Sequence, residues 1–243
     1  MRVLLIKTSS MGDVIHTLPA LTDALAAIPD LEVDWVVEEA FADLARRHPA
    51  VYQVFPCALR RWRKHPFKAR RSGEWATFKS AVQASKYDAV IDAQGLIKSA
   101  FVTRLGRGPS FGLDKHSARE GLSARVLDHP LAVAKGQHAI DRVRQLFALA
   151  LGYTLPGSAP DYGLPRSHVP TSLNRPAQLV FCHGTTWPTK HYPEAFWRQL
   201  VELASAEGHS VFLPWGNPME KDRATRLADG LSGAHVLPQM GLD

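Results

Sequence analysis

A small, polar loop near the amino terminus places an acid next to a predicted helix start. The loop covers residues 8–13, includes Ser10 and Asp13, and follows the apolar run 2–7. Free backbone N–H groups at the start of a helix favour an anion or an acidic side chain. From spacing alone, Asp13 is interpreted with about equal weight as a helix cap or as a general base.

The same loop gives no support for a nicotinamide cofactor. Its only glycine is Gly12, so it does not match the G-x-G-x-x-G fingerprint that lets a backbone approach a pyrophosphate. No cofactor of any kind is predicted from the sequence. Lys7 and His16, which flank the loop, are interpreted as local polar contacts rather than as catalysts.

A second loop combines hydroxyl groups with a lysine. Thr185, Thr186 and Lys190 lie between an apolar strand-like run and a predicted helix. Hydroxyl and ammonium donors suit a diphosphate, although the Walker spacing is absent. The alternative is a solvated turn capped by Thr186 or Thr189. It is less favoured, because it gives Lys190 and His191 no role.

Glu220 ends a third loop with chemical potential. The segment from Trp215 to Glu220 holds an aromatic ring, an amide and a carboxylate, which suit stacking or hydrogen bonding with a nucleoside. An acid also suits the first turn of a helix, where it complements the helix dipole. The sequence leaves both interpretations open.

Basic side chains are concentrated in one segment. The chain has a formal net charge of +6, yet residues 44–73 contain no acid and hold Arg46, Arg47, Arg60, Arg61, Arg63, Lys64, Lys68, Arg70 and Arg71. This concentration predicts a local anionic partner. Trp62, set among the cations of residues 60–64, suits a membrane interface. A solvated charge run is the alternative, and the interleaved Trp62 favours phosphate recognition on lipid or on nucleic acid.

Strands and helices alternate along the first part of the chain, which predicts a mostly parallel sheet with helices on both faces. The apolar spacing predicts strands at 2–7, 33–37, 52–55 and 89–92, and helices at 14–28, 41–45, 75–84, 96–105 and 138–151. Pro19 predicts a kink or a late start in the first helix. Ligands bind at the carboxyl ends of such strands, where the loops described above lie.

Five prolines between residues 156 and 176 interrupt both periodicities and predict a linker. The linker separates a first domain at residues 1–155 from a second at residues 177–243. In the second, strands are predicted at 179–182, 210–213 and 235–237, and helices at 193–207 and 217–229. Only three strands are predicted there, whereas most sheets have about five or six and a parallel sheet continues through a crossover helix after each strand. The second domain is therefore expected to be incomplete.

Composition excludes several classes of protein. The 243 residues are 45% hydrophobic and 21% charged, as in ordinary globular chains rather than fibrous or disordered ones. Cys57 and Cys182 lie far apart and outside metal-ligand spacing, so neither a disulfide framework nor a metal site is predicted. The amino-terminal apolar run is too short for a signal peptide, and no stretch approaches a membrane span. A cytosolic chain is expected.

These segments together resemble the inverting family of ADP-heptose glycosyltransferases, the heptosyltransferases of lipopolysaccharide core assembly. The resemblance covers essentially the whole chain and is carried by residues 1–21, 34–39, 60–64, 87–96 and 213–216, and by the loop with Thr185, Thr186 and Lys190. The form of loop 7–13 is more similar to the heptosyltransferases that act first than to those that act second. The resemblance implies an α/β fold of the GT-B type: two Rossmann-like domains with parallel sheets, the first binding acceptor and the second, incomplete, binding donor.

The resemblance also implies an activity and a role for each candidate residue. The activity is inverting transfer of L-glycero-D-manno-heptose from ADP-heptose to the inner Kdo sugar of Kdo-lipid A, with no metal. On the acceptor side, Asp13 is matched to the general base, Ser10 to a neighbour of the acceptor, and the basic patch to acceptor phosphates and carboxylates through Arg60, Arg61, Arg63 and Lys64. On the donor side, the diphosphate is matched to Thr185, Thr186 and Lys190, and the nucleoside and sugar to Glu220.

The resemblance places the protein at the cytoplasmic face of the inner membrane, with peripheral contact to an anionic membrane surface and no nucleic-acid partner. Two alternatives stay open. One is a nucleic-acid-binding protein that uses the basic patch. The other is an acceptor-binding fragment that cannot use the donor, because the family continues past residue 243 with an Asp-Thr-Gly segment and a histidine that help to bind it.

Overall fold

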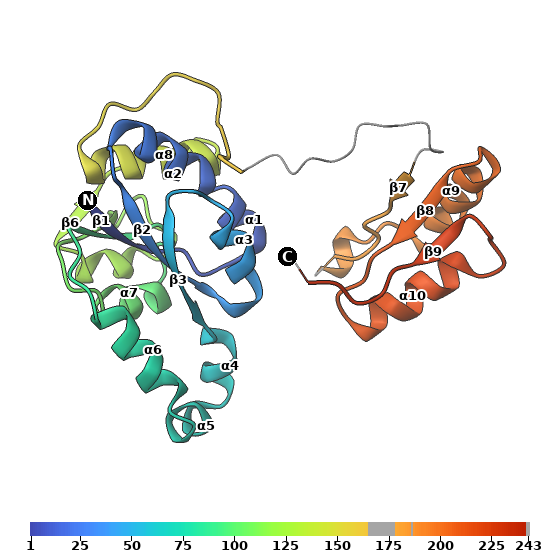
Figure 1. The fold of residues 1–243 in the computed structure, drawn as a ribbon, viewed down its shortest axis with the longest axis horizontal. Coiled ribbons are helices and arrows are strands. Elements are labelled where there is room, and N and C mark those ends of the chain that lie inside the picture. Colours follow the sequence, from blue (N-terminus) through green and yellow to red (C-terminus); the bar gives the residue numbers. More distant parts are fainter. Residues whose placement is uncertain (165–177, 186, 242–243) are drawn as a thin grey trace. The chain divides into compact units, whose positions relative to one another are not determined.

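Six parallel strands form the sheet of the first unit, in the order β3-β2-β1-β4-β5-β6 (Figure 1). The computed structural model describes residues 1–164, 178–185 and 187–241. They form two units, which we call the first unit (residues 1–164) and the second unit (the remaining described residues). The strands of the first unit are β1 (Arg2–Ile6), β2 (Glu32–Glu38), β3 (Val51–Cys57), β4 (Ala89–Asp92), β5 (Ser110–Leu113) and β6 (His129–Leu131).

Helices cover both faces of this sheet. They are α1 (Met11–Ile15), α2 (Leu18–Ala27), η1 (Glu39–Phe41), α3 (Ala42–Arg46), α4 (Leu59–Lys64), α5 (Pro66–Arg71), α6 (Glu74–Gln83), α7 (Ile97–Thr103), η2 (Gly121–Val126) and α8 (Ala139–Leu151). Alternate residues of β1 enter two separate cores. Val3 and Leu5 pack in one core with residues of α2, α3 and α8, whereas Leu4 and Ile6 pack in the other with residues of α6 and α7. Successive side chains of a strand point to opposite faces, so the central strand is buried on both.

The first predicted helix is divided in two. The sequence predicted one helix over 14–28, and the structure has α1 followed by α2, with Pro19 in the first turn of α2. Proline lacks the N–H that a helix interior needs but is accommodated in a first turn. Of the two outcomes predicted at Pro19, the late start is the one observed. The short strands β5 and β6 and the helices α4 and α5 were not predicted at all.

The start of the predicted linker packs on the first unit. Arg144, on α8, pairs with Asp23 at 2.6 Å, and both side chains are buried. The same guanidinium donates to the carbonyls of Pro156 and Ser158, each at 3.2 Å. The first unit therefore extends to at least residue 164 instead of ending at 155, and residues 165–176 of the predicted linker lie outside the described residues.

The sheet described in the second unit is narrower than that of the first, with three parallel strands in the order β7-β8-β9. Its elements are β7 (Gln178–Val180), η3 (Pro188–Lys190), α9 (Glu194–Ala206), β8 (Ser210–Leu213), α10 (Pro218–Ala228) and β9 (Ala234–Val236). Its core holds the buried side chains of Val201, Ala204, Val211, Leu213, Ala224 and Leu227. The alternation predicted for this part of the chain is therefore confirmed element by element.

The two cysteines differ in environment. Cys57, at the end of β3, is buried, and burial raises the pKa of its thiol to about 12. Cys182, two residues after β7, is exposed, and neither cysteine forms a disulfide.

Among the described residues, no helix is both long and apolar enough to cross a membrane. In the part of the chain that the structure describes, no three or more His, Cys, Asp or Glu side chains are grouped so that they could hold a metal ion.

Candidate functional site

A small cavity opens where β1, β4 and β5 end. Its volume is about 150 Å³, and its lining consists of Lys7, Asp13, Ala93, Gln94, Leu113, Arg119, Ala139, Arg142, Val143 and Leu146. The residues that follow parallel strands meet at the carboxyl edge of a sheet, where α/β proteins bind ligands. The cavity therefore lies where the sequence placed the functional edge, and it contains the predicted acid.

Asp13 has two carboxylate oxygens with different partners. Oδ2 accepts hydrogen bonds from the backbone N–H of Ser10 at 2.7 Å and from its hydroxyl at 3.0 Å. Oδ1 lies 4.0 Å from Nζ of Lys7, and the side chain is 44% exposed. Asp13 is thus a cap of α1 and, at the same time, an accessible carboxylate on the cavity wall. The two interpretations left open by the sequence are compatible.

Lys7 is part of the site, which the sequence analysis did not predict. It is buried at the end of β1, and its Nζ donates to the carbonyl of Ala93 at 2.9 Å. Burial lowers the pKa of Lys7, and the charges of Asp13 and Asp92 partly oppose that shift. The signal available in the sequence was its position as the last residue before the loop that carries Asp13.

Two arginines join Lys7 in the cavity, and neither was predicted. Arg142 lies on α8 and donates to the carbonyl of Ser117 at 2.7 Å. Arg119 belongs to the segment between β5 and η2. One carboxylate and three cations in one small cavity suit a hydroxyl-bearing ligand that also carries negative charge. A sugar acid has this chemistry.

The loop that carries Asp13 is braced by the neighbouring strand. Gln94, just after β4, accepts hydrogen bonds through Oε1 from the backbone N–H groups of Thr8 and Ser9, at 3.0 and 3.2 Å. Asp92 in turn accepts from the N–H groups of Gln94 and Gly95. Burial raises the pKa of Asp92, and these N–H donors oppose the shift. The acid is therefore held by a network that spans β1 and β4.

The predicted basic patch lies on α4, which follows the carboxyl end of β3. Arg60, Arg63 and Lys64 are exposed. Arg61 instead forms ion pairs with Glu74 at 2.8 Å and with Glu39 at 3.2 Å. Its charge is thus partly neutralised, so it is less available to a ligand than the other three.

Trp62 does not face a membrane interface, contrary to the sequence prediction. Its indole N–H donates to Glu74 at 2.7 Å. Its ring packs against Trp75 and Phe78, with centroids 5.6 and 5.4 Å away. Trp62 therefore anchors α4 to α6, since aromatic pairs in edge or tilted contact stabilise packing.

In the second unit, Glu220 is held at the start of α10. Its backbone N–H donates to Oδ1 of Asn217 at 3.0 Å, and its Oε2 accepts from the backbone N–H of Gly216 at 2.8 Å. A Cβ atom on Gly184 would lie 2.6 Å from Oε1 of Glu220, so this carboxylate sits directly against the loop after β7. The structure thus brings the second and third predicted loops together.

The remaining residues that the resemblance matches to the donor lie on that loop. Thr185 is partly exposed and Lys190 is exposed, at the end of η3. Thr186 lies outside the described residues. The hydroxyl of Thr185 and the amine of Lys190 are therefore placed on one strand-to-helix connection, as predicted.

Two further polar residues of this loop cluster were missed. His183 is buried, and burial, followed by the charge of Arg223, lowers its pKa. Arg223 donates to the carbonyl of His183 at 3.1 Å and lies 2.6 Å from Nδ1 of His191. Arg223 follows Glu220 by three residues on α10, so both lie on the helix face toward this loop. That spacing was the signal that could have found it.

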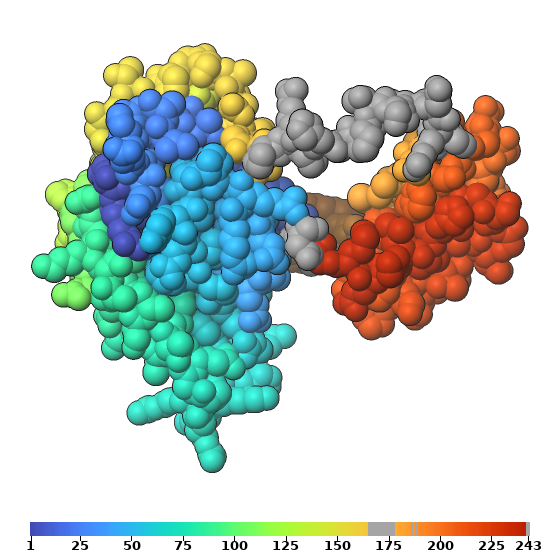
Figure 2. All heavy atoms as spheres, viewed as in Figure 1, coloured from blue at the N-terminus to red at the C-terminus, as the bar shows by residue number. Residues whose placement is uncertain are grey.

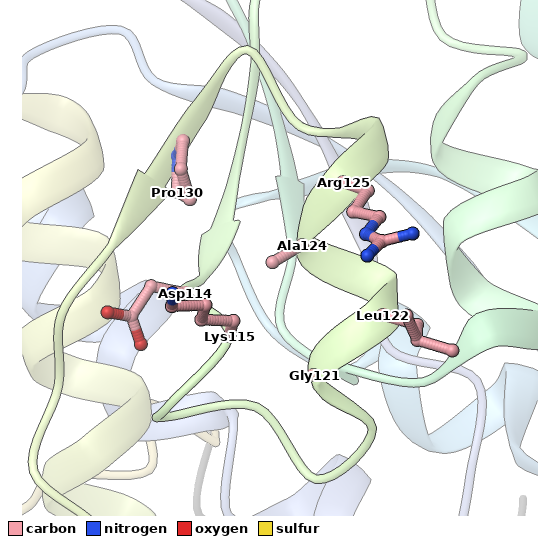
Figure 3. Close-up of a pocket in the computed structure, with 7 residues that line it drawn as sticks. All are labelled: Asp114, Lys115, Gly121, Leu122, Ala124, Arg125 and Pro130. Carbon is pink, nitrogen blue, oxygen red and sulfur yellow. The ribbon is translucent and has the colours of Figure 1, made fainter.

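A larger cavity of about 700 Å³ lies elsewhere in the first unit. Its lining consists of Asp114, Lys115, Gly121, Leu122, Ala124, Arg125 and Pro130. Figure 3 shows Ala124 on the side of η2 that faces β5 and β6, and Leu122 and Arg125 projecting from the other side. The cavity lacks a carboxylate held beside a cation as Asp13 is held beside Lys7. Chemistry rather than volume therefore identifies the smaller cavity as the candidate site.

Comparison with known proteins gives consistent matches over the whole chain. The sequence model of glycosyltransferase family 9 (heptosyltransferase) matches residues 75–243. Lipopolysaccharide heptosyltransferase 1 of Pseudomonas aeruginosa is 56% identical over 100% of this chain and 68% of the relative. The protein of the same name from Escherichia coli K12 is 50% identical over 100% of this chain and 77% of the relative.

Solved structures agree with these sequence matches. E. coli heptosyltransferase WaaC with ADP-2-deoxy-2-fluoro heptose is similar with a TM-score of 0.92 and 50% identity, covering 100% of this chain and 78% of that one. E. coli ADP-heptose lps heptosyltransferase II has a TM-score of 0.72 at 20% identity, covering 96% and 69%. The second likeness concerns the fold alone.

Proposed function

The chain belongs to glycosyltransferase family 9, the heptosyltransferases, and from this membership we propose that it transfers L-glycero-D-manno-heptose from ADP-heptose to the inner Kdo sugar of Kdo-lipid A. Heptose transfer to lipopolysaccharide is the activity that its relatives carry in their names. The fold is GT-B, with two α/β units built on parallel sheets. The observation that carries the residue-level proposal is the Asp13 carboxylate on the wall of a cationic cavity.

In this proposal the first unit binds the acceptor. The carboxylate of the Kdo sugar meets the cations of the small cavity, Lys7, Arg119 and Arg142. Asp13 removes the proton from the acceptor hydroxyl as that oxygen attacks the anomeric carbon of heptose. The bond from the anomeric carbon to the ADP oxygen breaks in the same displacement, so the configuration inverts and ADP leaves with the bonding electrons. Ser10 holds the base in place through its two hydrogen bonds to Oδ2.

The second unit binds the donor. Lys190, Thr185 and Thr186 hold the diphosphate and stabilise the negative charge that develops on departing ADP, with no metal required by these residues. Glu220 contacts the nucleoside or the heptose, and its fixed position beside Gly184 and Gly216 supports that role. Solved structures of E. coli WaaC contain ADP and ADP-2-deoxy-2-fluoro heptose, which supports ADP-heptose as the donor.

The exposed cations of α4 extend the acceptor site. Arg60, Arg63 and Lys64 contact the phosphates of Kdo-lipid A, with a smaller contribution from the ion-paired Arg61. Because this acceptor is a lipid, the protein works at the cytoplasmic face of the inner membrane and touches its anionic surface peripherally. The charge of the basic segment supports this location.

The experiment that tests the proposal replaces the base without changing its shape. Asp13→Asn is expected to lower heptose transfer to Kdo-lipid A by about 100-fold or more, the scale of a lost general base. The matched control is Ser10→Ala, which removes one cap hydrogen bond and keeps the carboxylate. Transfer is followed with ADP-heptose, and unfolding by calorimetry.

The result is decided by comparing turnover with stability. Loss of a cap costs about 1 kcal/mol of stability and leaves most of the turnover in place. If Asp13→Asn lowers the free energy of unfolding by that amount while turnover stays close to that of the wild-type protein, Asp13 is a cap only. The catalytic role is then wrong.

A further inference from the structure

Two short helices form an arm at one end of the first unit. The arm, residues 59–72, contains α4 and α5 and projects from the body of the first unit (Figure 1; cyan in Figure 2). Trp62 anchors its base through Glu74, Trp75 and Phe78. The anchored side faces the unit, so the other side of the arm is left to solvent.

The exposed side of the arm carries an unpartnered aromatic ring. Phe67, near the start of α5, is 84% exposed, the highest value among the large apolar side chains of the described residues. Ala69, two residues later, is buried, so α5 turns a small residue inward and its phenylalanine outward. Exposing a ring of this size to water is unfavourable. A ligand that was only a soluble anion would give the ring no partner.

Exposed cations flank Phe67 along the sequence of the arm. Arg63, Lys64, Lys68, Arg70 and Arg71 are exposed, and the segment contains no acid from Leu44 to Gly73. Among the described residues, the ion pairs of the arm all belong to Arg61. An apolar ring among free cations matches the surface of an anionic bilayer, where acyl chains accept the ring and lipid headgroups accept the charges.

We propose that this arm docks the protein on an anionic lipid bilayer, with Phe67 entering the boundary between headgroups and acyl chains. Lys68, Arg70 and Arg71 contact the headgroups around it. The inference deepens the proposed function and rests on it only for the expectation that the acceptor is presented in a membrane. The residues assigned to docking lie on α5 and line no part of the Asp13 cavity, whereas the cations assigned to the acceptor lie on α4. Substitutions on α5 therefore separate docking from transfer.

Vesicle binding tests the docking element directly. The protein is sedimented with phosphatidylcholine vesicles that contain or lack phosphatidylglycerol. We expect binding only to the anionic vesicles, and Phe67→Ala is expected to weaken the partition coefficient by about tenfold or more, as for an apolar ring withdrawn from a membrane. The control is Phe101→Ala, which removes a ring on α7 that is 71% exposed and lies outside the arm.

Insertion is measured with a fluorescent ring at the same position. In Phe67→Trp, the introduced indole is expected to be quenched by brominated acyl chains in anionic vesicles, whereas in Phe101→Trp it is not. Absence of quenching at position 67, or equal loss of binding in the two alanine variants, overturns the proposal. So does equal binding to neutral and anionic vesicles.

A soluble acceptor separates this inference from the proposed function. Phe67→Ala is expected to transfer heptose to a deacylated Kdo acceptor at the wild-type rate. If Phe67→Ala binds vesicles normally but loses affinity for the deacylated acceptor, the arm binds acceptor phosphates only. The docking proposal is then wrong. If the wild-type protein binds vesicles but transfers no heptose to either acceptor, the proposed function fails while the docking element stands.

Discussion

The first strand of each unit shows how differently the two halves support their functional loops. β1 pairs with β2 on one side and β4 on the other, and its residues from Val3 to Ile6 have no exposed surface. Among the described residues, β7 pairs only with β8, and its last residue, Val180, is 59% exposed. Both strands lead into a loop and then a helix. The two units therefore share the same local pattern of strand, loop and helix, but β1 is supported by a strand on each side whereas β7 is supported on one side.

The difference extends to the loops themselves. The loop before Asp13 is held across the sheet, by Gln94 after β4. The loop after β7 is held from α10 by Arg223, which donates to the carbonyl of His183, and it lies against the carboxylate of Glu220. A chemical base needs one fixed position, because small displacements of a reacting group cost rate. The loop after β7, which we propose binds the nucleotide sugar, does not share that requirement, because it must admit and release its ligand.

The most severe test of this comparison is an equal cavity in each core. Leu5 and Leu213 are both fully buried, and Leu→Ala at such positions costs about 2 to 5 kcal/mol. We expect Leu213→Ala to unfold the second unit while the first stays folded. We expect Leu5→Ala to lower the midpoint of the first unit without unfolding it at 25 °C. Hydrogen exchange read by mass spectrometry follows each unit separately.

Two results would contradict a difference in stability between two independently folded units. If Leu213→Ala leaves amide protection in α9, α10 and β8 unchanged at 25 °C, the three-stranded sheet is as robust as the six-stranded one. If both variants lose protection everywhere at once, the units do not unfold independently.

A smaller effect is expected from pH, and it belongs to the first unit. His48 is buried, its Nδ1 accepts from the backbone N–H of Ala50 at 3.2 Å, and its Nε2 lies 3.0 Å from the hydroxyl of Thr22. Burial lowers the pKa of His48 from 6.5 to about 4. The unfolded chain therefore binds a proton between these two values that the folded unit does not bind.

The direction in which stability changes with pH follows from that difference in bound protons. The stabilising contribution of neutral His48 is complete above pH 6.5 and is lost as pH falls toward 4. Its full size is on the order of 3 kcal/mol. We expect His48→Asn, whose amide oxygen replaces Nδ1 as the acceptor, to flatten the fall of the first unit's melting temperature across this range. Parallel pH curves for the two proteins would show that another group controls it.

The smallest expected effect concerns the second unit. Gly184→Ala would place a Cβ 2.6 Å from Oε1 of Glu220, and the flexible carboxylate would move and lose its hydrogen bond from Gly216. We expect stability to change by less than about 1 kcal/mol and ADP affinity to fall about threefold to tenfold. Calorimetric titration with ADP measures the change. Gly136→Ala is the control, since no atom lies within 4 Å of its added Cβ, and equal affinities in the two variants would remove Glu220 from the donor site.

Much of the fold could be predicted because its central strands are short segments of mostly apolar residues. β1, β2 and β4 are buried on both faces, and such strands are visible in a sequence as short apolar segments. β5 and β6 lie toward the edge of the sheet and contain Ser110, Gly112 and Pro130, so they have no such run. The arm was missed because its helices are short and mostly charged.

The candidate site could be predicted only where it is local. Asp13 and Ser10 are three residues apart, and a cap spacing within one turn is visible in the sequence. Arg119 and Arg142 reach Lys7 through the fold, from segments more than 100 residues away along the chain. Trp62 was assigned to the wrong surface for a related reason, since its partner Glu74 lies beyond the basic segment.

The contrast between the two thiols makes the second unit selectively addressable by chemistry. Only a thiolate attacks a maleimide, and a buried thiol with a pKa raised to about 12 supplies almost none at neutral pH. Cys57 is therefore silent, while exposed Cys182 lies next to His183 at the neck of the loop that carries Thr185. This chain thus accepts a single fluorophore beside the loop that we propose binds the donor diphosphate, with no cysteine to remove or introduce.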